Sequence, residues 1–96
     1  MPFKAFKPNQ CRRAYKNKGF VENKKKDHCY YYLSVEGERT HIQTKVSHTN
    51  KKAIGKPSFS KMARDLSVSN QFLTEFIDCD KEYDDLIAEL RSQGLI

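Results

Sequence analysis

The chain has 96 residues, enough for one domain with a modest hydrophobic core. Its 18 lysines and arginines outnumber 12 aspartates and glutamates, which gives a formal net charge of +6. No segment approaches the roughly 20 apolar residues of a bilayer-spanning helix, and the first ten residues lack the apolar centre of a signal peptide. We therefore expect a cytoplasmic protein with no membrane segment, whose basic surplus favours nucleic acid or another polyanion as partner.

The charge is divided along the chain, with most basic residues before residue 62 and acidic residues concentrated in 80–96. The first two thirds therefore form the expected polyanion-binding part, and the tail has an expected structural or protein-binding role. The three cysteines are widely spaced and odd in number, which favours reduced thiols over a disulfide framework. The histidines and cysteines show no C-x-x-C or H-x3-H spacing, so no metal and no other cofactor is expected.

The N-terminal half predicts one helix followed by three strands. Cys11, Ala14 and Tyr15 follow the helical i, i+3, i+4 spacing, and we expect Asn9 to cap this helix and Gly19 to end it. Phe20 opens a first strand. Two further strands are expected at 28–35, which is rich in aromatic residues, and at 39–47, which alternates strictly between apolar and polar positions.

Gly37 predicts a tight turn between the second and third strands. With Gly37 at the first central position of a type II′ turn, Glu36 faces Arg39. The register that follows places one apolar set on the core face and a second set on the opposite face. The core set is Cys29, Tyr31, Leu33, Ile42, Thr44 and Val46, and the opposite set pairs His28 with Ser47, Tyr30 with Lys45, Tyr32 with Gln43, and Ser34 with His41.

The C-terminal part predicts three short amphipathic helices with apolar stripes at residues 59–66, 72–77 and 83–90. We expect Ser58 and Ser69 to cap the first two, and Gly94 to stop the third. The element order is then α-β-β-β-α-α-α, in the α+β class with a three-stranded antiparallel sheet. We divide the chain into a flexible lead at 1–8, a folded domain at 9–79 and a helical extension at 80–96 packed on that domain.

His28 is the sharpest candidate for chemistry. It starts a strand beside Lys24, Lys25 and Lys26 and diagonally across from Lys45. A histidine can take a proton from a ribose 2′-hydroxyl while lysines stabilise charge on the phosphate. The alternative interpretation is a solvated histidine at a loop–strand junction.

Phosphate contacts are expected from the lysines near one end of the sheet. These are Lys24, Lys25, Lys26, Lys45, Lys51, Lys52 and Lys56, with Tyr30 and His48 nearby. Tyr30 and Tyr32 either stack on bases from the open face of the sheet or pack under the C-terminal helix.

The motifs together resemble the HicA family of type II toxin–antitoxin toxins, over roughly residues 9–77. The resemblance is carried by KGFVE at 18–22, KKKDH at 24–28, TKVSHTNKKAI at 44–54 and SFSKMARDLSVSNQF at 58–72. It matches Gly19 to the helix stop, His28 to the catalytic histidine and His48 to the histidine of a P-x-H segment. Lys26 and Asp27 stand where the family has small residues.

The resemblance implies a fold like that of double-stranded-RNA-binding domains, and metal-independent cleavage of mRNA with His28 as general base. It also implies a HicB-like antitoxin as protein partner. Two alternatives remain open from the residues. One is a non-catalytic RNA-binding module on the same fold, and the other is an adaptor domain that uses the acidic tail to bind a protein.

Overall fold

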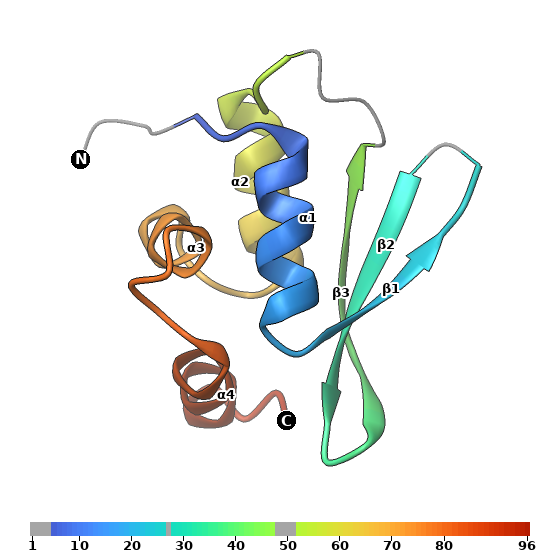
Figure 1. Ribbon diagram of the computed structural model, residues 1–96. Helices are drawn as coiled ribbons and strands as arrows, with labels where there is room; N and C mark the ends of the chain where they lie inside the picture. Colours follow the sequence, from blue (N-terminus) through green and yellow to red (C-terminus); the bar gives the residue numbers. More distant parts are fainter. Residues whose placement is uncertain (1–4, 27, 48–51) are drawn as a thin grey trace.

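The computed structural model describes residues 5–26, 28–47 and 52–96, which form four helices and one three-stranded antiparallel sheet in the order α-β-β-β-α-α-α (Figure 1). The elements are α1 (Pro8–Asn17), β1 (Phe20–Lys24), β2 (His28–Val35), β3 (Glu38–Ser47), α2 (Lys56–Asp65), α3 (Asn70–Ile77) and α4 (Tyr83–Ser92). The predicted α+β class and element order are confirmed.

The described helices lie on one side of the sheet, and α1 packs directly against it (Figure 1). The core between the two layers is rich in aromatic side chains. Tyr15 of α1 lies 5.1 Å from Phe20 and 5.3 Å from Tyr31 between ring centroids, and Phe76 of α3 lies 6.2 Å from Phe20. Tyr15 and Tyr31 are fully buried. The sheet therefore has one face in the core and one face that these helices leave open.

Alternation along β2 decides which side chains enter the core, as predicted. Cys29, Tyr31 and Leu33 are buried, whereas His28 and Tyr30 are half-buried on the other face. The predicted pairing holds from His28↔Ser47 through Tyr32↔Gln43. Because the side-chain period of a strand is two, this part of the register fixes the orientation of the His28 end of the sheet.

The turn itself was predicted wrongly. Val35 pairs with Glu38, so Glu36 and Gly37 are the two central residues, and Gly37 occupies the second position. Both have positive φ, 53° at Glu36 and 80° at Gly37, which is the signature of a type I′ turn. The expected pairing of Glu36 with Arg39 is replaced by the pairing of Ser34 with Arg39.

A bulge in β3 changes the register between the turn and Tyr32, so that the pairing from Tyr32 to His28 is the predicted one although the turn is not. The pairing shifts between Tyr32 and Ser34, so Ser34 does not face His41 as predicted. The Thr40 hydroxyl donates to the Leu33 carbonyl at 2.9 Å and accepts from the Ile42 amide at 3.2 Å. These bonds satisfy backbone groups that the interrupted ladder leaves without strand partners.

We expect Glu36→Asn to raise the free energy of unfolding by about 0.5–1 kcal/mol, because asparagine tolerates the left-handed region better than glutamate. Urea denaturation followed by circular dichroism measures the change. The exposed Glu38, which has no positive φ, provides the control as Glu38→Asn. A parent-like stability of Glu36→Asn would contradict the assignment of the turn.

The helix caps follow the predicted pattern only in part. Ser69 caps α3 as expected, because its hydroxyl accepts from the Phe72 amide at 3.0 Å. Asn9 and Ser58 do not cap their helices. Each of these helices begins earlier, with Lys7 and Gly55 at the cap positions, because proline favours the first turn and extends the helix toward the N-terminus.

The chain before α1 takes part in the core. Phe6 is 2% exposed, and its ring stacks on Phe59 of α2 with centroids 5.9 Å apart. The Ile54 amide donates to the Phe6 carbonyl at 2.7 Å. This segment therefore links the start of α1 to the segment that leads into α2.

The corner after α1 is held by residues from α3 and α4. Gly19 has a φ of 89° and ends α1 as predicted. Lys18 is 5% exposed, and its ammonium donates to the carbonyls of Phe76 and Lys81. The Tyr83 hydroxyl donates to the Ser34 carbonyl at 2.8 Å. The start of α4 is thus fixed to both α1 and the sheet, and Leu86, Ile87 and Leu90 are buried in the same core.

Among the described residues, no helix is long and apolar enough to cross a membrane.

Candidate functional site

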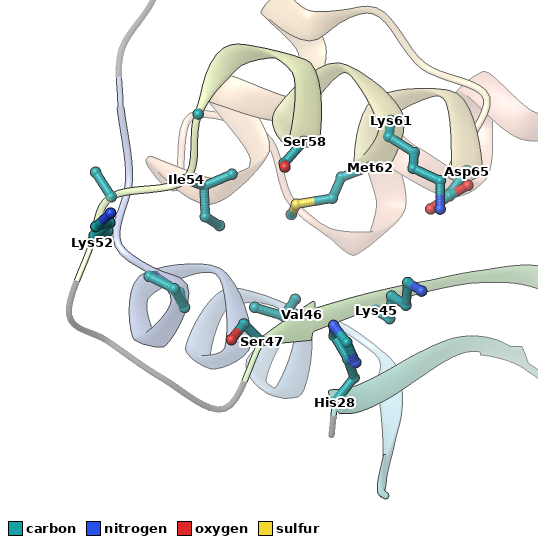
Figure 2. A pocket seen from close by; sticks show the side chains of 13 residues that line it. His28, Lys45, Val46, Ser47, Lys52, Ile54, Ser58, Lys61, Met62 and Asp65 are labelled. Atoms are coloured by element: carbon teal, nitrogen blue, oxygen red, sulfur yellow. The ribbon is translucent and has the colours of Figure 1, made fainter. Parts of the chain in front are cut away.

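His28 lies at the mouth of a cavity between the sheet and α2. The cavity has a volume of about 290 Å³. Figure 2 shows His28 at the start of β2 and Lys45 on β3, facing Lys61 and Asp65 from α2. The cavity is lined by Pro8, His28, Lys45, Val46, Ser47, Lys52, Ala53, Ile54, Gly55, Ser58, Lys61, Met62 and Asp65. We call it the His28 cavity.

The position of His28 is fixed by its backbone. His28 pairs with Ser47 at the end of the sheet, and its carbonyl accepts from the Lys25 amide at 2.9 Å. The Arg12 guanidinium of α1 donates to the Ser47 carbonyl. The start of β2, which carries His28, is therefore hydrogen-bonded to β3, and the end of β3 is hydrogen-bonded to α1. The residue His28 itself is half-buried and lines the cavity.

Charge in the His28 cavity is predominantly positive. Lys45, Lys52 and Lys61 line it, and each is exposed. The one carboxylate among the lining residues is Asp65, whose Oδ2 accepts from the buried Thr44 hydroxyl at 3.1 Å. Three ammonium groups and one carboxylate thus line the His28 cavity, and the carboxylate accepts a hydrogen bond from β3.

The structure separates the lysine triplet that the sequence groups together. Lys24 lines a hollow between α1 and β1, and Lys25 lines another on the open face of the sheet. Lys26 is exposed in the connection between the two strands. Of the predicted site residues, Lys45 and Lys52 line the same cavity as His28, with Lys52 at the opposite end from His28 (Figure 2). Lys24 and Lys25 line the two neighbouring hollows.

Tyr30 and Tyr32 lie on the open face, whereas α4 lies with the other helices on the opposite side (Figure 1). Tyr30 lines a hollow with Lys45 and also the open-face hollow with Lys25. The Arg39 guanidinium lies 4.3 Å from the centroid of the Tyr32 ring. Tyr30 and Tyr32 therefore lie on the open face of the sheet, as in the first of the two alternatives, and do not pack under the C-terminal helix.

Three residues of the predicted site region, His48, Lys51 and Asp27, lie outside the described residues.

Sequence reasoning missed the contribution of α2 to the site. Ser58, Lys61 and Asp65 are spaced by three and four residues, so they lie on one face of α2, and all three line the His28 cavity. That spacing is a signal in the sequence, on a face of the helix distinct from its apolar stripe. Arg12, Arg13 and Lys16 were also missed, and they line the hollow between α1 and β1 with Lys24.

The three cysteines differ in their exposure to solvent. Cys11 and Cys29 are buried, as predicted for Cys29, and Cys79 is exposed. Burial raises the pKa of the Cys11 thiol to about 12, which keeps it protonated and unreactive near neutral pH. Within the ranges that the structure describes, no three His, Cys, Asp or Glu side chains are grouped closely enough to share a metal ion.

Comparisons of the chain with protein-family models, with curated proteins and with solved structures find no match.

Proposed function

We propose that the protein is an RNA endonuclease of the HicA type, a toxin that cleaves mRNA without a metal ion. One observation carries the proposal: a half-buried histidine at a strand end opens onto a cavity lined by Lys45, Lys52 and Lys61. Histidine exchanges protons near neutral pH, and lysines attract phosphate. The element order α-β-β-β-α supports a fold of the double-stranded-RNA-binding type.

The chemistry that this site would support is transesterification at one phosphodiester. The His28 imidazole takes the proton of a ribose 2′-hydroxyl, and the 2′-oxygen forms a bond to the adjacent phosphorus. The bond from phosphorus to the 5′-oxygen breaks, and the leaving oxygen takes a proton from water. The products are a 2′,3′-cyclic phosphate and a 5′-hydroxyl end. Nearby ammonium groups stabilise the negative charge on the phosphoryl oxygens in the transition state.

The lysines around His28 would bind the RNA backbone rather than particular bases. Lys45 and Lys52 line the His28 cavity, and Lys24 and Lys25 face the two neighbouring hollows. Each lysine that neutralises a phosphate adds to the salt dependence of binding. This arrangement supports binding of a strand that passes over the end of the sheet.

We expect His28→Ala to slow RNA cleavage by about 100-fold or more, the usual effect of removing a general base. The assay follows a labelled RNA in the presence of EDTA and identifies the ends of the products. The parent should leave 2′,3′-cyclic phosphates, and EDTA should not alter its rate.

His41→Ala is the matched control, because His41 is exposed on β3 and does not line the His28 cavity. It should cleave at the parent rate. Cleavage by His28→Ala at the parent rate would overturn the proposal. Salt-sensitive RNA binding without cleavage by the parent at any pH would instead identify a non-catalytic RNA-binding module.

We further propose, from the resemblance, a HicB-like antitoxin that blocks the His28 cavity. The adaptor alternative requires the tail, where Asp84 and Asp85 are exposed on α4. A neighbouring reading frame for a HicB-like protein supports the first idea. A partner that is lost when Asp84 and Asp85 become asparagines, with RNA cleavage unchanged, supports the second.

A further inference from the structure

The open face of the sheet carries a preorganised group of side chains next to the His28 site. The Arg39 guanidinium lies over the Tyr32 ring, 4.3 Å from its centroid, and its Nη2 donates to Gln43 Oε1 at 2.7 Å. Tyr32 pairs with Gln43 across the two strands. Two separate contacts therefore hold the guanidinium over the ring.

These three residues line a hollow, and the other lining residues are Asn23, Lys25 and Tyr30. The lining contains two phenol rings, two carboxamides and two cations, and no carboxylate. That chemistry is unlike the site for a hydrophobic peptide or for a cation. Flat aromatic and guanidinium surfaces, amide donors and positive charge together match a nucleobase with its attached phosphate.

The position of the hollow connects it to the proposed catalytic site. His28, Tyr30 and Tyr32 alternate on one face of β2, so Tyr32 lies about 14 Å along the strand from His28 at the usual rise per residue. Tyr30 lies between them, and its cross-strand neighbours are Asn23 of β1 and Lys45 of β3. A strand of RNA whose phosphate sits at His28 can run along this row.

We propose that Tyr32, Arg39 and Gln43 form a subsite for a base of single-stranded RNA, and that Tyr30 stacks on the preceding base toward His28. This inference rests on the proposed action on RNA, and it adds that the substrate is single-stranded along this face. A paired base is already stacked within a duplex and cannot lie flat on Tyr30 or on the Arg39 guanidinium that covers Tyr32. Gln43 uses its oxygen to accept from Arg39, so its amide donors remain for the edge of a base.

The test measures binding of a short fluorescein-labelled RNA of mixed sequence, without self-complementarity, in the His28→Ala background so that the RNA stays intact. Tyr32→Ala should weaken binding by about tenfold, because it removes the ring that holds the Arg39 guanidinium under the base, and a stacked base contributes roughly 1–3 kcal/mol. Arg39→Lys keeps the charge but not the plane and should also weaken binding, whereas Tyr32→Phe should bind like the background protein. The fully paired duplex of the same sequence should bind more weakly than the single strand.

Three controls separate stacking from charge and from folding. Arg91→Ala removes an exposed arginine on α4 and should leave binding unchanged apart from a small effect of net charge. RNA with 2-aminopurine reports stacking directly, so its fluorescence should fall on binding to the background protein and recover with Tyr32→Ala. Thermal unfolding by circular dichroism checks that each variant is folded.

The proposal fails if folded Tyr32→Ala and Arg39→Lys bind single-stranded RNA as tightly as the background protein, or if the duplex binds as tightly as the single strand. Its failure is distinct from that of the proposed function. Cleavage that depends on His28 but not on Tyr32 overturns the subsite alone. Binding that depends on Tyr32, without cleavage by the parent, overturns the nuclease alone.

Discussion

Replacing Lys18 by methionine is expected to lower the free energy of unfolding by about 3 kcal/mol, because a buried charged donor of two hydrogen bonds is lost. The ammonium donates to the Lys81 carbonyl at 2.8 Å and to the Phe76 carbonyl, and it lies 4.9 Å from the Phe76 ring centroid. Methionine retains most of the stem that covers the ring. The change therefore isolates the ammonium group and leaves the Lys81 carbonyl without this donor.

The direction of the effect is not self-evident, because replacing a buried ion pair by apolar residues is often neutral or stabilising. Lys18 differs from such pairs. Its carboxylate neighbour Glu82 is 3.7 Å away and 63% exposed, so the main acceptors are backbone carbonyls that the substitution cannot remove. A positive charge at the end of α3 is also favoured by the helix dipole.

Urea denaturation provides the measurement, with Lys16→Met as the matched control. Lys16 lies in the last turn of α1, two residues before Lys18. It is 56% exposed and lies 3.9 Å from the Glu22 carboxylate in an ion pair. Its replacement should change stability by less than about 1 kcal/mol, as is usual for exposed pairs. Equal effects of the two substitutions would show that the buried position of Lys18 contributes nothing.

Gly19→Ala is expected to destabilise the protein by about 3 kcal/mol, of which roughly 1–2 kcal/mol is the cost of a left-handed backbone for a residue with a Cβ. The remainder comes from Tyr83, because a Cβ on Gly19 would overlap its ring. The Tyr83 ring cannot retreat without losing its hydrogen bond to the Ser34 carbonyl. Thermal and urea unfolding measure the loss.

Two comparisons separate the backbone cost of Gly19→Ala from the cost of the overlap with Tyr83. Gly94 has a φ of 75° with no atom within 4 Å of an added Cβ, so Gly94→Ala should show the backbone cost alone. In a Tyr83→Ala background, Gly19→Ala should likewise cost only the backbone term, and a double-mutant cycle gives the coupling. A coupling of zero would rule out the contact as the cause.

Prediction from sequence succeeded where a local pattern, such as the alternation of side chains along a strand, determines the structure. The alternation through Cys29, Tyr31 and Leu33 fixed the faces of β2, because a one-residue slip would have exposed all three. The turn was misassigned because glycine suits either central position of the primed turns. The bulge depends on the Thr40 hydroxyl reaching the Leu33 carbonyl, which no pattern of apolar residues reveals.

The site was predicted less completely than the fold. His28 and Lys45 follow from strand pairing, which is local along the hairpin. Lys61 and Asp65 reach the same cavity because α2 packs beside β3, and that placement is a tertiary property. Lys18 falls in the basic first two thirds of the chain, yet its burial against the α3–α4 connection keeps it out of any polyanion-binding surface.

The two hydrogen bonds that Lys18 donates also affect the expected rate of unfolding. They join positions separated by 58 and 63 residues, and closing a loop of that length costs roughly 3–4 kcal/mol of chain entropy. A contact with so large an entropic cost is expected to form after the hairpin, on the native side of the folding barrier. Its loss would then accelerate opening of the chain while leaving the folding rate nearly unchanged. Lys18 would therefore set how long the C-terminal helices stay docked once the sheet has formed.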